Sequence, residues 1–283
     1  MPYRTGLTLV CAAVMTGMVA LASPPPAEAA GVVLTPHRAI YELKLLRTRG
    51  KRDVEAVRGR ILYDFSGSPC AGYALNFRQV SELDSGENKT ALSDLRATTW
   101  EEGSAKRFRF SSENFLNEKS VDKVDGEAER DADHVGVKLA QPIDKTFDLD
   151  RTMVFPTEHM RRIIEAAREG KSILELPVYD GSENGQKVYS TMTLIGHEIA
   201  PDEKVPTDAA AGQAALAGLK RWPVTISYFD RNDKQRGEQV PIYSISFELY
   251  ENGISRALAL DYEDFVIAGE MSQLEIKDPP PCK

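Results

Sequence analysis

Apolar and polar residues alternate along most of this 283-residue chain, a pattern typical of half-buried β-strands. Ile61, Tyr63 and Phe65, for example, fall on one face of such a strand. The same period of two recurs in many segments, and we predict strands over residues 37–48, 57–65, 71–79, 89–100, 106–115, 133–139, 174–179, 187–195, 222–229, 240–250, 253–262 and 265–276. Strands therefore account for most of the chain.

One segment follows helical spacing instead. Apolar residues recur there at i, i+3, i+4 and i+7, in the order Met160, Ile163, Ile164 and Ala167. We predict a helix over about residues 157–169, with Thr157 as its N-cap and Gly170 just after its end. We expect the apolar face of this helix to dock onto the sheet.

These elements predict a mainly β fold in a single domain, residues 30–283. An antiparallel sheet of many strands curls into a barrel or half-barrel, with the helix inside it or across its mouth. Residues 201–220 are rich in Ala and Gly, and we interpret them as an insertion in a connection that holds at most a short helix.

The first 29 residues have the features of a secretory signal peptide. Arg4 precedes a long apolar run, and Ala27-Glu28-Ala29 fits a cleavage site, with Ala22 as the alternative point of cleavage. No later segment approaches the length of apolar sequence that a membrane-spanning helix needs. We therefore predict an exported periplasmic protein without a transmembrane span.

Predicted export makes a disulfide bond between cysteines possible. The chain has three, and Cys11 lies within the predicted leader, so the mature protein has Cys70 and Cys282 and one possible pairing. We predict a disulfide bond between them, because exported proteins meet an oxidising compartment. Two unpaired buried cysteines are the alternative.

The chemical motifs in the chain are incomplete. Gly170-Lys171-Ser172 lacks the first glycine of a phosphate-binding loop, and His197-Glu198 lacks the second histidine of a zinc protease. The four histidines show no metal-ligand spacing, and the acidic cluster at 144–150 is interpreted as a solvated turn. We predict no catalytic residue, metal or cofactor, and the net charge of −8 argues against a nucleic-acid partner.

One predicted sheet face carries many aromatic and aliphatic residues, including Tyr73, Leu75 and Phe77. Two interpretations are open. The face is an ordinary core, or it forms a concave apolar surface that binds a lipid or an extended peptide.

Five segments together resemble the EipB family of periplasmic cell-envelope-integrity proteins of alphaproteobacteria. Their order and spacing carry the resemblance, and they are Gly67-Ser68-Pro69-Cys70-Ala71-Gly72-Tyr73, Phe155-Pro156-Thr157-Glu158-His159, Tyr179-Asp180-Gly181-Ser182 with Ile195-Gly196 downstream, Asp261-Tyr262-Glu263-Asp264-Phe265, and Cys282. The resemblance spans about residues 32–282, although the segment 201–220 has no clear match.

The resemblance implies a β-spiral or half-barrel similar to the lipoprotein carriers LolA and LolB, with an early and a C-terminal cysteine joined, here Cys70 and Cys282. It implies a role in envelope integrity and no enzymatic activity. We thus expect a monomer that acts by binding envelope proteins or lipids. The alternatives are a lipid or lipoprotein carrier that uses the concave face, and a cell-wall hydrolase whose site is assembled in space.

Overall fold

The computed structural model describes residues 31–49, 54–86, 89–203, 206–231 and 239–282. The predicted signal peptide and its cleavage site lie outside these residues. The folded unit begins at Val32 and continues to the end of the chain, and it is this unit that is described below.

A single antiparallel sheet of fourteen strands makes up most of the unit. Its strands are β1 (His37–Thr48), β2 (Ala56–Ser68), β3 (Gly72–Asp84), β4 (Thr90–Glu101), β5 (Arg107–Leu116), β6 (Lys119–Arg130), β7 (His134–Gln141), β8 (Lys145–Asp150), β9 (Ile173–Val178), β10 (Tyr189–Ile195), β11 (Arg221–Asp230), β12 (Tyr243–Tyr250), β13 (Ser255–Asp261) and β14 (Phe265–Ile276). Helix α1 (Pro156–Arg168) lies in the connection between β8 and β9.

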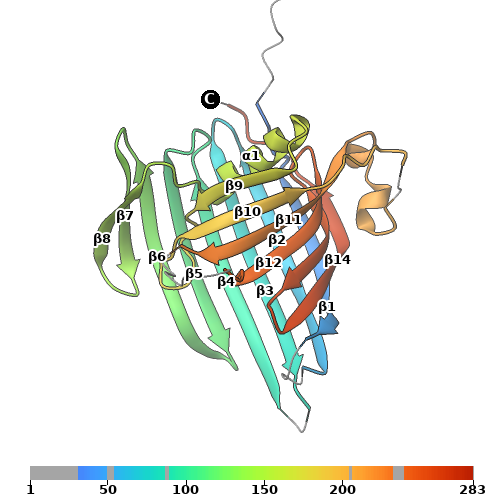
Figure 1. Ribbon diagram of the computed structural model, residues 1–283, viewed down its shortest axis with the longest axis horizontal. Helices are drawn as coiled ribbons and strands as arrows, with labels where there is room; N and C mark the ends of the chain where they lie inside the picture. The colour runs from blue at the N-terminus through green and yellow to red at the C-terminus, as the bar shows by residue number, and fades with distance from the viewer. Residues whose placement is uncertain (1–30, 50–53, 87–88, 204–205, 232–238, 283) are drawn as a thin grey trace, which may run out of the picture. The chain divides into compact units, whose positions relative to one another are not determined.

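The sheet curls round on itself without closing. Strands β1 to β8 pair in sequence order, β9 to β14 do the same, and β1 joins the two halves by pairing with β14, so that β8 and β9 form the two edges. Figure 1 shows β9 to β12 crossing in front of the long strands β2 to β6, with α1 at one end of the space between them. The predicted half-barrel with one docked helix is confirmed.

Two strands, β6 and β8, were not predicted from the sequence pattern. Strand β6 buries only Val124 and Ala128, so it lacks a continuous apolar face. Strand β8 occupies the acidic segment that was interpreted as a turn, and that interpretation was wrong: Phe147 and Leu149 alternate there with exposed neighbours. Strand β8 is an edge strand, so a neighbouring strand pairs with it on one side only. Few of its residues are therefore buried, and its apolar pattern is weak.

The inner face of the sheet holds most of the core. The first cluster lies against α1 and includes Ile163, Ile164 and Trp222. A second cluster centres on β1, β2 and β14. In the third, Tyr179 and Val188 pack against the inner side chains of β5 to β8.

Helix α1 buries the predicted face. Ile163, Ile164 and Ala167 are buried, and Met160 packs against the same cluster. The predicted N-cap at Thr157 was wrong, because Phe155 is the N-cap residue and makes no side-chain cap hydrogen bond. After the helix, Gly170 has a φ of +73°, as expected for a residue that ends a helix.

Residues 206–220 pack against β14, and Ala210 and Leu216 are buried in the second core cluster. They form two short 3₁₀ helices, η1 (Ala209–Gly212) and η2 (Ala214–Leu216), in agreement with the short helix that was predicted. Asp208 accepts a hydrogen bond from the Ala210 N–H and pairs with Arg256 at 2.7 Å. This insertion therefore attaches to the sheet through apolar packing and a charged contact.

Cys70 and Cys282 form a disulfide bond, with 5.6 Å between their Cα atoms. Cys70 lies in the turn between β2 and β3, so the bond attaches the C-terminal tail to the start of the long strands. The predicted pairing is confirmed.

Candidate ligand-binding site beneath helix α1

The three residues predicted to form an apolar binding face all lie on the inner face of β3, but they reach different surroundings. Tyr73 is only 1% exposed, its ring stacks on Phe65 at 5.3 Å, and its hydroxyl oxygen accepts a hydrogen bond from the Leu34 N–H at 3.4 Å. Phe77 packs within the second core cluster. Leu75 alone lines a cavity. Whether any of them binds a ligand stays a prediction.

This cavity has a volume of about 180 Å³ and lies between the inner face of the sheet and α1. Its apolar lining comes from the N-terminal segment, four strands and the helix, and it includes the side chains of Leu34, Tyr63, Phe65, Leu75, Met160, Val178 and Ile226. Because segments distant in sequence supply these side chains, the curl of the sheet is what brings them together.

Two histidines add polar groups to the lining. His37 donates from Nδ1 to the Thr35 carbonyl oxygen at 2.8 Å and stacks on Tyr63. Burial lowers the pKa of His37, although the hydrogen bond to Thr35 acts in the opposite direction. Burial, reinforced by the positive charge of Arg162, lowers the pKa of His159 to about 4. Both rings are therefore neutral at neutral pH.

Asp180 is the carboxyl group of the lining. Its Oδ1 accepts a hydrogen bond from the Ser182 N–H at 2.9 Å. Burial raises the pKa of Asp180, although this hydrogen bond opposes the shift. Burial thus acts against charge on His37, His159 and Asp180, so the cavity suits an apolar chain or a neutral polar group better than an ion.

A second buried carboxyl group holds α1 in place over the cavity. Glu101 on β4 is 1% exposed and accepts hydrogen bonds from the N–H groups of Thr157 at 2.7 Å and Glu158 at 2.8 Å. It thereby satisfies two of the free donors at the start of the helix. Burial raises the pKa of Glu101 to about 7, although the two N–H groups act in the opposite direction.

Glu158 strengthens this attachment. Its carboxylate pairs with Arg130 of β6 at 2.9 Å and with Arg162 of α1 at 2.5 Å. Arg162 donates within the helix, whereas Arg130 connects the helix to the sheet. The roof of the cavity is thus fixed from two strands, β4 and β6.

The arrangement is suited to binding. Across the described ranges, no group of three or more His, Cys, Asp or Glu side chains is placed to hold a metal ion. His159 comes within 3.5 Å of the Thr191 hydroxyl, but that hydroxyl donates to the Leu176 carbonyl oxygen at 2.9 Å. The same described residues contain no helix that is both long and apolar enough to span a bilayer.

Sequence reasoning did not identify His37, His159 or Asp180 as lining residues. Two of them lie in segments that carried the family resemblance, around Phe155-Pro156 and Tyr179. The helical spacing also placed Met160 on the docked face. No local pattern, however, predicts which inner-face residues are left beside a cavity.

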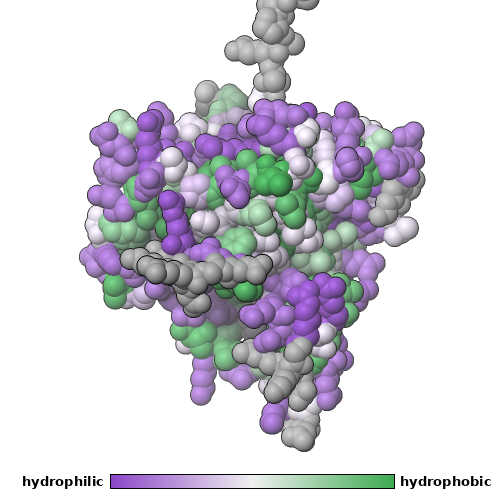
Figure 2. Space-filling view, viewed as in Figure 1, coloured by the Kyte–Doolittle hydropathy of each residue, from purple (hydrophilic) through white to green (hydrophobic). Residues whose placement is uncertain are grey.

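The outer surface near this end of the sheet carries apolar side chains as well. Ile173 on β9 and Leu194 on β10 are cross-strand neighbours and are 57% and 45% exposed. Figure 2 shows hydrophobic surface over this region, bordered by hydrophilic residues.

Comparison with known proteins gives one consistent family. The model of the EipB-like family matches residues 28–278. The chain is 39% identical over 250 residues to the cell envelope integrity protein EipB of Brucella abortus (strain 2308), which covers 88% of this chain and 87% of that protein. A crystal structure from Brucella abortus, described as a beta-barrel-like protein of domain of unknown function DUF1849, superposes with a TM-score of 0.80 at 38% identity, covering 87% of this chain and 99% of that one.

Proposed function

This chain belongs to the EipB-like family, and on that premise we propose that it supports cell-envelope integrity in the periplasm as a non-enzymatic binding protein. Its ligand is the apolar chain of a lipid or lipid-bearing partner, which enters the cavity beneath α1. The name of the Brucella abortus relative supports the envelope role, and the cavity supports the mode of action.

The cavity carries the proposal. Apolar side chains from the N-terminal segment, the sheet and α1 surround it, and burial disfavours charge on His37, His159 and Asp180. Its volume of about 180 Å³ is smaller than the roughly 300–1,000 Å³ of pockets that enclose whole drug-sized ligands. The site therefore takes the methyl end of an acyl chain, and the rest of the ligand stays outside.

A fluorescent fatty acid tests this proposal. The probe is dodecanoic acid labelled at its carboxyl end with nitrobenzoxadiazole, so that its methyl end is free to enter the cavity. Saturable binding to the full mature chain is expected. Leu75→Gln and Met160→Gln each place an unpaired amide in the lining, which costs about 1–3 kcal/mol and should weaken binding about tenfold.

Leu194→Gln is the matched control, because Leu194 lies on a strand but points outward and is already exposed. This variant should bind the probe like the unaltered protein. Equal weakening by all three substitutions, or no saturable binding, would contradict the proposal. Hydrolysis of a cell-wall substrate that survives repurification and is lost in His159→Gln would favour the hydrolase alternative instead.

A protein partner is the second candidate, and the exposed pair Ile173 and Leu194 favours it. Such a partner would dock on the outer surface and leave the cavity empty. Crosslinking in envelope extract distinguishes the two: loss of a protein adduct in Leu194→Gln supports this candidate, whereas loss of lipid binding in Leu75→Gln supports the first.

A further inference from the structure

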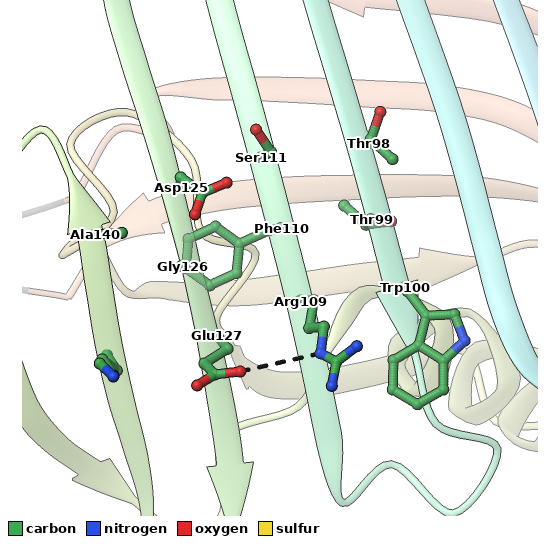
Figure 3. A pocket seen from close by; sticks show the side chains of 11 residues that line it. Thr98, Thr99, Trp100, Arg109, Phe110, Ser111, Asp125, Gly126, Glu127 and Ala140 are labelled. Carbon is green, nitrogen blue, oxygen red and sulfur yellow. Dashed lines mark ion pairs between the residues drawn. The ribbon is translucent and has the colours of Figure 1, made fainter.

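The outer face of β4 to β7 is hollowed into a groove of about 440 Å³, on the opposite side of the sheet from the cavity beneath α1. Figure 3 shows this groove from outside, with Trp100 at one end and the side chains of β5 and β6 beside it. The small residues Gly126 and Ala140 line its floor, and the register between β6 and β7 shifts at Asp125 and Gly126. A bulge of this kind bends the strand and so helps to hollow the face.

A row of large polar and aromatic side chains crosses the groove at right angles to the strands. Trp100 pairs with Arg109, Arg109 with Glu127, and Glu127 with Lys138. Since neighbouring strands lie about 4.8 Å apart, the row extends over roughly 14 Å. The sheet register thus builds a linear platform from four separate strands.

Trp100 is positioned as the flat end of this platform. A Cβ atom at Gly72 would lie 2.7 Å from the indole ring, so the ring rests directly on the backbone of β3. Figure 3 shows its other face directed outward from the sheet. The Arg109 guanidinium lies 5.5 Å from the ring centroid, which helps to hold the indole in this orientation.

The charges in the groove balance. Arg109 and Lys138 are positive, and Asp125 and Glu127 are negative. The contact between Arg109 and Glu127 is long, at 3.9 Å, and both side chains are more than half exposed. Their donors and acceptors are therefore available to a ligand, whereas the balance of charge favours neither a polyanion nor a polycation.

We propose that this groove binds a neutral oligosaccharide that lies along the row from Trp100 to Lys138. The apolar C–H face of a sugar ring stacks on the outward face of Trp100. Sugar hydroxyls both donate and accept hydrogen bonds, and the row offers carboxylates as acceptors and Arg and Lys as donors. A lipid chain would have to cover the charged side chains of the groove, which is costly, and an extended peptide would find no free backbone edge, because β4 to β7 are paired on both sides.

This site lies on the opposite face of the sheet from the proposed acyl-chain site, and of the groove residues only Thr99 also lines the cavity. Trp100, Arg109, Glu127 and Lys138 line the groove alone. Occupation of either site can therefore be measured without the other.

Tryptophan fluorescence gives a direct readout, because the chain has two tryptophans and Trp222 is 2% exposed in the core. In a Trp222→Phe background, Trp100 is the remaining reporter. Titration with chitohexaose or cellohexaose, both neutral, should change its emission saturably. Calorimetry on the unaltered chain with the same sugars gives a second measurement that does not depend on that background.

Three substitutions locate the binding. Trp100→Ala and Arg109→Ala should each raise the Kd at least about tenfold, and Trp100→Phe should retain part of the affinity because it keeps an aromatic face. Arg60→Ala is the matched control: Arg60 forms an exposed ion pair with Glu42 on the outer face of another part of the sheet and should leave the Kd unchanged. The proposal is overturned by absence of binding at millimolar sugar, by preferred binding of alginate or phosphatidylglycerol vesicles, or by equal Kd values in all variants.

Discussion

Helix α1 and the insertion 206–220 both bury apolar side chains against the same sheet, but they differ in how much apolar surface and how many charged groups they use. The helix lies on the inner face through Ile163, Ile164 and Ala167, in a cluster of aliphatic and aromatic side chains. In the insertion, Ala210 and Leu216 are buried in the second core cluster, and Asp208 pairs with Arg256 at 2.7 Å. Both contacts therefore combine apolar and charged groups, but the helix buries the larger apolar face, and the ion pair of the insertion belongs to a wider charged network.

The charged contact is part of a buried network. Arg221 is 1% exposed and pairs with Glu248 at 2.8 Å, and Glu248 also pairs with Arg256. Burial raises the pKa of Glu248, but hydrogen bonds and charge from Arg221 and Arg256 outweigh it and hold the pKa below its ordinary value. Each charge in this network depends on the others, because an unpaired buried charge is costly.

This difference predicts how substitutions in each contact should change the stability of the fold. An apolar contact responds to any polar group placed within it, whereas an ionic network responds to the loss of one member and tolerates replacement of a whole pair by apolar residues. The predictions below test that distinction.

The largest effect is expected at α1. Ile163→Asp places an unpaired carboxylate in a fully buried position and should lower the free energy of unfolding by about 4 kcal/mol. Glu165→Asp, on the exposed side of the same helix, should change it by less than about 1 kcal/mol. Urea unfolding followed by circular dichroism measures both, and similar losses in the two variants would show that the helix is peripheral.

A somewhat smaller effect is expected at the insertion. Asp208→Ala leaves Arg256 with one carboxylate partner fewer and should destabilise the fold by about 3 kcal/mol. Asp202→Ala, at an exposed position of the same connection, should cost less than about 0.5 kcal/mol.

The double variant Asp208→Leu/Arg256→Met sharpens the test of the ion pair between Asp208 and Arg256. It should recover much of the loss, because an apolar pair replaces the ion pair. If the double variant is less stable than Asp208→Ala, the insertion is not held in the way described here. The same urea titration decides between these outcomes.

The smallest effect concerns pH. The pKa of His159 is about 4 in the folded protein, below its ordinary value of 6.5. A lowered pKa means that the stabilising contribution is present above 6.5 and is lost as the pH falls toward 4. Between about pH 7.5 and about pH 5 this amounts to about 2 kcal/mol, which His159→Gln should abolish.

Glu101 acts in the opposite sense. Its pKa of about 7 is raised, so its contribution is greatest at acidic pH and is lost as the pH rises through about 7. Because Glu101 is unchanged in His159→Gln, the difference between the two pH profiles isolates the histidine. Identical profiles would contradict the buried neutral state of His159.

Much of the fold follows from the sequence. Alternation predicted most strands because one face of the sheet is buried, and helical spacing predicted the face of α1 because that face meets the core. Because Cys11 falls in the predicted signal peptide, the other two cysteines left one pairing. The strands and the helix face follow from local sequence patterns, and the disulfide follows from the number of cysteines.

What the sequence could not predict depends on distant residues. The cap of α1 comes from Glu101, more than fifty positions before the helix, so Thr157 was a reasonable but incorrect choice. Strand β6 was missed because its partners supply the apolar surroundings that it lacks itself. The predicted binding face was divided for the same reason, since neighbouring elements bury Tyr73 and leave Leu75 beside a cavity.

Methyl NMR tests the central claim most directly, namely that an apolar chain binds beneath α1. The described chain has four methionines: Met160 lines the cavity, Met153 and Met271 are buried in the other two core clusters, and Met192 lies on β10. During titration with dodecanoic acid, the ¹³C-methyl signal of Met160 should shift saturably while those of Met153 and Met271 stay in place. Saturable binding that leaves the Met160 signal unchanged, or shifts all four signals alike, would contradict the account.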